Sequence, residues 1–167
     1  MRKTAELGFF LAVAMILSYI ESLIPLSFGI PGIKLGLPNL VVVMLLFGQR
    51  YGSKEALLVN GMRIILSGFL FSNLYAILYA LAGATFSFIA MLTGKRFHCF
   101  SVIGVSVLGG VFHNIGQIVV AMLVVETFAV SYYIPFLIVA GTITGALLGL
   151  IVMEIIPYLA RYRQYSR

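Results

Sequence analysis

Three polar residues interrupt one of the most apolar runs of the chain. His113, Asn114 and Gln117 lie within "GGVFHNIGQIVVAMLVV", residues 109–125, which has no polar face large enough to meet water. An imidazole and two amides can donate and accept hydrogen bonds, and an imidazole can also titrate near neutral pH. Gln117 follows His113 by one helical turn on the same side. These residue types and spacings predict either a ligand site or a polar network between helices.

A permanently charged side chain, Arg63, lies within another apolar run. Asn60 and Ser67 flank it at helical spacing, so the three form a polar stripe. At 1.5 Å per residue, Arg63 lies about 12 Å and His113 about 18 Å from the same membrane face, within reach of one long side chain. A charge at this depth must face the bundle interior and have a partner.

The partner of Arg63 is not evident from the sequence. Glu21 and Glu126 are expected near the outer side, and Glu55 lies two turns back toward the cytoplasm. An Arg63 without a carboxylate, beside the neutral polar groups around His113, would suit an anionic or strongly hydrogen-bonding ligand. A structural network that ties the two helices together is the alternative.

The stretch "IESLIPLSFGIPGIKLGLPNL", residues 20–40, is the second informative segment. Its prolines and glycines prevent one continuous helix. Non-helical backbone at membrane depth is tolerated where it packs on protein or lines a cavity. Glu21 stands at its entrance, Lys34 at its centre and Asn39 at its exit. We expect a cap over the outer end of a bundle that places one cation above a pocket, with a simple surface turn as the alternative.

The elements that position these residues are membrane helices. The chain is 62% hydrophobic and 10% charged, with a mean hydropathy of +1.11, whereas soluble domains are about 45–50% apolar and about 25% charged. Because the first apolar run is longer than a signal-peptide core, we expect it to be retained. Apolar runs of bilayer-crossing length or near it predict one transmembrane domain, residues 1–167, with six spans at about 5–26, 35–49, 55–72, 73–93, 101–125 and 132–157.

Basic residues predict the orientation. With both termini cytoplasmic, nine of the eleven Lys and Arg residues lie inside, as the positive-inside bias requires in a plasma membrane protein. The net charge of +6 therefore encodes orientation and does not indicate nucleic-acid binding. Span 35–49 is short and opens with Gly36 and Pro38. A re-entrant segment there would leave five crossings and reverse everything after it.

Small residues form stripes on three spans, where they let helix backbones approach. The stripes are Ala5, Gly8 and Ala12 in the first span, Ala80, Gly83, Ala84 and Ser87 in the fourth, and Gly141, Gly145 and Gly149 in the sixth. Each predicts either packing within the monomer or docking to another membrane protein. The first span is the best candidate for docking.

Several chemistries lack their residues in this sequence. One cysteine, Cys99, allows no internal disulfide and no cysteine-cluster metal site, and every acidic residue is Glu. There is no phosphate-binding glycine-lysine loop, no GxSxG and no HExxH. We expect no catalytic residue, no metal and no cofactor in this chain.

The segments "PGIKLGLPN" and "GGVFHNIGQ" carry a resemblance over nearly the whole chain. It resembles the small membrane family called heptaprenyl diphosphate synthase component I, also labelled Gx transporter. The matching positions are Glu21, Pro25, residues 31–39, Arg63, His113, Asn114 and Gln117. Pro38 stands where the family typically has Ala.

That family is similar, more distantly, to the substrate-binding S components of energy-coupling factor transporters. This similarity implies a six-helix bundle with both termini cytoplasmic and an outward pocket under a first-loop lid. It also implies an Ala-x-x-x-Ala motif that docks to a transmembrane coupling protein served by two cytoplasmic ATPases. Gly8-x-x-x-Ala12 is the nearest match here.

The two resemblances imply different functions. The leading hypothesis is the substrate-binding component of an uptake transporter, whose small ligand meets Glu21, Lys34, Asn39, Arg63, His113, Asn114 and Gln117. The alternative is a non-catalytic accessory subunit of polyprenyl diphosphate synthesis. Prenyl chain elongation needs clustered aspartates that hold magnesium and diphosphate, and this chain has no Asp, so a partner subunit would catalyse it. A proton-coupled or purely structural protein, with His113 titrating, is the third hypothesis.

Overall fold

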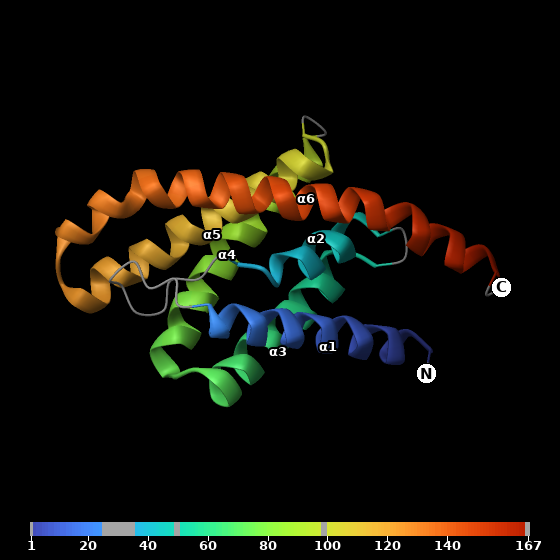
Figure 1. Ribbon diagram of the computed structural model, residues 1–167, viewed down its shortest axis with the longest axis horizontal. Helices are drawn as coiled ribbons and strands as arrows, with labels where there is room; N and C mark the ends of the chain where they lie inside the picture. Colours follow the sequence, from blue (N-terminus) through green and yellow to red (C-terminus); the bar gives the residue numbers. More distant parts are fainter. Residues whose placement is uncertain (1, 25–35, 49–50, 98–99, 166–167) are drawn as a thin grey trace.

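The fold is all-helical, as predicted (Figure 1). The computed structural model describes residues 2–24, 36–48, 51–97 and 100–165, and no strand occurs among them. The helices are α1 (Arg2–Leu23), α2 (Asn39–Phe47), α3 (Ser53–Phe71), α4 (Leu74–Arg96), α5 (Val102–Val125), the 3-10 helix η1 (Phe128–Tyr133) and α6 (Ile134–Tyr165).

Four stretches of the described chain are long and apolar enough to cross a bilayer. They are Lys3–Leu23, Leu74–Arg96, Val102–Val125 and Phe128–Leu159. The shortest has 21 residues and, at 1.5 Å per residue, matches a hydrocarbon core about 30 Å thick. These helices indicate a multi-pass membrane protein. The sequence predicted six crossings, and four such stretches occur among the described residues. The number six therefore stays a prediction.

Helix α3 differs from those four stretches because it is polar on one face. It has 19 residues, and its charged residues include Arg63 in the middle. Asn60, Arg63 and Ser67 are all buried, whereas Leu58 and Phe69 on the opposite side are exposed. A helix with an exposed apolar face and a buried polar stripe is built like a membrane helix that turns its charge toward the bundle.

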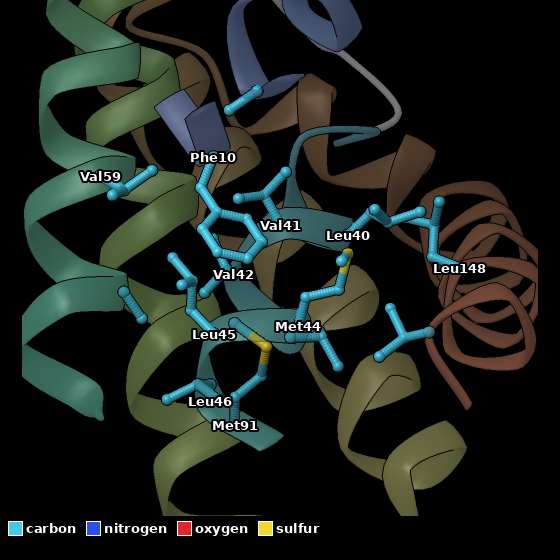
Figure 2. Packing of buried hydrophobic residues seen from close by; sticks show 14 of the residues in the cluster. Phe10, Leu40, Val41, Val42, Met44, Leu45, Leu46, Val59, Met91 and Leu148 are labelled. Carbon is cyan, nitrogen blue, oxygen red and sulfur yellow. The ribbon is translucent and has the colours of Figure 1, made fainter. Parts of the chain in front are cut away.

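Helix α2 lies at the centre of the molecule and is shorter than the predicted span 35–49. It has 9 residues, about 14 Å at 1.5 Å per residue. A turn with Gly36 at φ 79° precedes it, and Pro38, which has no N–H, stands at its N-cap. Its side chains fill the core between Phe10 of α1, Val59 of α3 and Leu148 of α6 (Figure 2). The boundaries predicted from the apolar run were therefore wrong, because a glycine turn occupies its first residues.

The segment that contains α2 runs antiparallel to α1. At one end Gly36 N–H donates to Glu21. At the other end the Tyr51 hydroxyl donates to Glu6, and its ring packs against Phe10 at 5.5 Å between centroids. From Glu6 to Glu21 the helix rises about 22 Å. Gly36 and Tyr51, which precede and follow α2 in the chain, thus lie beside opposite ends of α1.

The chain termini lie at one end of the bundle, and two lysines make contacts between helix ends. Figure 1 shows the N- and C-termini at the same end. The Lys3 ammonium lies 2.5 Å from a Glu55 carboxylate oxygen at the start of α3. Lys95, at the end of α4, donates to the Leu46 carbonyl at the end of α2. These contacts bring together residues that the sequence assigned to one side of the membrane.

Helix α5 packs closely on α6 through glycines. A Cβ added to Gly141 would lie 2.7 Å from the Gly110 carbonyl oxygen, and one added to Gly145 would lie 2.7 Å from the Ser106 carbonyl oxygen. No real side chain fits at such distances without a shift of backbone. The α6 stripe therefore packs within the monomer, which was one of its two predicted uses.

Candidate functional site

His113 lies in a space that two glycines leave open. A Cβ added to Gly83 of α4 would lie 2.9 Å from its Cε1 and Nδ1 atoms. A Cβ added to Gly36, in the turn before α2, would lie 3.3 Å from its Cδ2 atom. The imidazole is thus enclosed between α4 and the end of the outer connection. This contact also explains the small residue at position 83, which the sequence placed in a packing stripe.

Asn114 faces a different neighbour from His113. Its Nδ2 donates to the Leu137 carbonyl of α6 at 2.8 Å. Gln117 stays with His113, since its Cγ atom would also lie 2.9 Å from a Cβ on Gly83. Adjacent helical positions point about 100° apart, so an amide directly after His113 turns to another helix. The structure brings His113 and Gln117 together and leaves Asn114 to connect α5 with α6.

Arg63 is buried beside polar groups of its own helix and of α1. Its Nη2 donates to Asn60 Oδ1 at 2.6 Å. The Glu21 carboxylate interacts with it electrostatically, and Arg63 in turn acts on His113. The sequence left the partner of Arg63 open among three glutamates, and Glu21, buried in the last turns of α1, is the one that acts on it electrostatically. This removes the excess positive charge that the sequence suggested.

Glu21 also holds the exit of the outer connection. Its Oε1 accepts the Gly36 N–H at 2.5 Å and the Leu37 N–H at 3.2 Å. These donors precede α2, where N–H groups lack helical acceptors and where the helix dipole favours a negative charge. Glu21 thus ties this backbone to the bundle. Of the predicted cap, Lys34 lies outside the described residues.

Asn39, the first residue of α2, has a buried amide with neither atom hydrogen-bonded within the described chain. The same holds for Nε of Arg63. Leaving such a group unpaired costs about 1–3 kcal/mol. A Cβ on Gly36 would lie 3.0 Å from Asn39 Nδ2, so the amide adjoins the turn that also touches His113.

Four predicted residues are buried and are linked through Gly36 or through electrostatic interaction, and we call them the buried polar cluster: Glu21, Asn39, Arg63 and His113. They come from four different helices, α1, α2, α3 and α5. The cluster can offer amide, guanidinium and imidazole hydrogen bonds around the turn at Gly36. Its charges are one carboxylate and one guanidinium. The described residues contain no group of three His, Cys or Glu side chains that could hold a metal ion.

The small-residue stripe of α1 faces outward. Ala5, Gly8 and Ala12 are exposed, and a Cβ added to Gly8 would meet nothing within 4 Å. The stripe therefore packs on no described part of this chain. The sequence predicted it as a docking surface for another membrane protein, and that use stays a prediction.

Comparison with known proteins identifies the family. A family model described as heptaprenyl diphosphate synthase component I matches residues 10–155. The match includes all of α2, α3, α4, α5 and η1, parts of α1 and α6, and every residue of the buried polar cluster. No curated protein and no solved structure matches the chain. With most of its length matched, the chain belongs to the heptaprenyl diphosphate synthase component I family.

Proposed function

We propose that the chain is the non-catalytic membrane subunit of a polyprenyl diphosphate synthase. Its membership of the component I family over residues 10–155 is the observation that carries this proposal. The name of the family implies a second subunit, and a sequence without Asp has no Asp-rich motif to hold magnesium and diphosphate. Catalysis would belong to that second subunit, with this chain holding it at the membrane.

Affinity purification from native membranes in mild detergent tests the proposal. We expect an Asp-rich prenyl synthase to co-purify in a fixed ratio, and the pair to extend prenyl diphosphates at membranes faster than the synthase alone. Recovery of a coupling protein and ATPases, with no synthase, would contradict it.

A second function, substrate binding for an energy-coupled uptake transporter, is favoured by the outward-facing stripe of α1. Small residues let two membrane helices approach closely, and this stripe has no partner in the described chain. Gly8→Leu should then abolish co-purification with a coupling protein and its ATPases. Gly61→Leu on α3, where an added Cβ also meets nothing within 4 Å, is the matched control. Equal recovery with both variants would exclude docking through α1.

Under either function, the buried polar cluster would bind a small ligand, with Gln117 nearby; a contribution from Lys34, which lies outside the described residues, stays a sequence prediction. Support comes from the buried Asn39 amide and the Nε atom of Arg63, neither of which has a hydrogen-bond partner among the described residues. Radiolabelled candidates bound to purified protein, compared between wild type and Arg63→Ala, test this role. Equal binding by the two proteins would remove Arg63 from the site.

The membrane arrangement that we propose has six crossings, with both termini cytoplasmic in the plasma membrane. It is supported by the antiparallel course of α1 and residues 36–51 and by the basic residues near one end. Single cysteines at Ser53 and Ala129, both exposed, test it in a Cys99→Ser background. Impermeant maleimide should label position 129 from outside intact cells and position 53 only after lysis. The reverse pattern would overturn this orientation.

A further inference from the structure

Asn39 makes no contribution to folding that the structure reveals. Its side chain is 4% exposed, yet neither its donor nor its acceptor has a hydrogen-bond partner in the described part of the chain. The other eight residues of α2 are apolar. Pro38 occupies the N-cap, with no side-chain hydrogen bond there, so Asn39 does not cap its helix. A leucine of similar size would spare the protein an unpaired amide.

A backbone turn adjoins this amide. Gly36 adopts φ +79°, and a Cβ there would press on Asn39 Nδ2 at 3.0 Å and on His113 at 3.3 Å. The Glu21 carboxylate holds the Gly36 N–H, so the turn is fixed from the other side. A glycine turn therefore brings backbone close to the amide and the imidazole without covering them with a side chain.

The charges of the cluster favour an uncharged ligand. Arg63 is accompanied by Glu21, which lies near enough to interact with it and is 5% exposed. A diphosphate that approached the guanidinium would also approach this carboxylate in a medium that screens charge poorly. A neutral molecule meets no such repulsion and can still accept a hydrogen bond from Arg63 Nε.

We propose that Asn39 recognises a small uncharged molecule through a paired donor and acceptor, as a lactam, a ureide or a carboxamide presents them. An asparagine amide forms two parallel hydrogen bonds with such an edge, just as it does with adenine in nucleic acids. Arg63 Nε adds a third bond to an acceptor on the ligand. This inference rests on the proposed ligand-binding role of the cluster and specifies its ligand.

Two asparagine-to-leucine variants test the inference through opposite effects. Asn39→Leu should keep or raise the thermal unfolding midpoint in detergent while it abolishes ligand binding. Asn114→Leu, which loses the 2.8 Å bond to Leu137, should lower the midpoint and keep binding. A lower midpoint for Asn39→Leu would show that its amide serves the fold, and would overturn the proposal.

The class of ligand is tested with three probes and with native mass spectrometry of the chain purified from its own membranes. We expect 2-pyridone to raise the midpoint of wild type but not of Asn39→Leu. N-methyl-2-pyridone, which lacks the N–H, should give at most a fifth of that shift, and inorganic pyrophosphate none.

Any molecule that mass spectrometry finds retained on the protein should be uncharged with an amide-type edge. Stabilisation by pyrophosphate, or a retained phosphate ester, would overturn the ligand class but leave the site. If no probe binds and no small molecule is retained, the ligand-binding role itself fails.

Discussion

The Glu21 carboxylate accepts hydrogen bonds from the backbone before α2 and also supplies a negative charge to Arg63. Two substitutions separate these roles. Both backbone N–H groups, of Gly36 and Leu37, donate to the same oxygen, Oε1. Glu21→Gln keeps an oxygen for these bonds and removes only the charge beside Arg63. Glu21→Ala removes the acceptor as well. The difference in the free energy of unfolding between the two variants therefore measures how strongly Glu21 attaches the end of the outer connection to the bundle.

The magnitudes follow from what each variant leaves unpaired. Removing one partner of a buried ion pair costs about 3–5 kcal/mol, and we take this range as the upper bound for the electrostatic interaction of Glu21 with Arg63. We expect Glu21→Gln near the lower end, about 3 kcal/mol, because its hydrogen bonds persist. Glu21→Ala also leaves one buried and one partly buried N–H group without this acceptor, at about 1 kcal/mol each, so we expect about 5 kcal/mol.

The free energy of unfolding is measured by titrating the purified protein from mild-detergent micelles into sodium dodecyl sulfate. Arg63→Met and the double variant with Glu21→Gln complete a double-mutant cycle. The double variant should be about 2 kcal/mol more stable than the sum of the single effects predicts. Coupling below about 0.5 kcal/mol, or equal losses for Glu21→Gln and Glu21→Ala, would refute the two roles.

Three further substitutions test other parts of the fold. Gly36→Ala should lower stability by about 1–2 kcal/mol, since φ +79° is strained for a residue with a Cβ, and an unchanged unfolding midpoint would argue against this turn. Gly145→Leu should remove the monodisperse monomer peak of the detergent-solubilised protein in size-exclusion chromatography, because the facing α5 backbone lies 2.7 Å from an added Cβ. The control Gly8→Leu should elute like wild type. Equal elution of the two variants would contradict the α5–α6 contact. Lys95→Met should cost about 1–2 kcal/mol in the same unfolding titration, as it removes the donor to the Leu46 carbonyl at the end of α2; a wild-type value would mean that this bond is replaced by water.

The features readable from the sequence are those set by residues on one helix. Helical spacing placed Asn60, Arg63 and Ser67 on one face, and all three are buried. The interval of four between Gly141 and Gly145 predicted close backbone approach, and α5 provides the facing backbone. The same helical geometry turns Asn114 about 100° away from His113, so the prediction that placed both in one site neglected the angle between adjacent positions.

Contacts between helices were less predictable. Whether Glu21 reaches Arg63 depends on how far α1 and α3 shift along their axes, and apolar runs define such ends only to within several residues. The start of α2 was missed for a local reason, because Gly36 and Pro38 divert the backbone inside a continuous apolar run. The unpaired amide of Asn39 is visible only once its neighbours are placed.

An experimental density map of the protein in lipid, purified from its own membranes, tests the central claim most directly. The claim is that Glu21, Asn39, Arg63 and His113 form one site with room for a small molecule. We expect connected non-protein density against the Asn39 amide and Arg63 Nε, with the Glu21 carboxylate still accepting the Gly36 N–H. Side chains packed against both groups, or isolated waters alone, would contradict it.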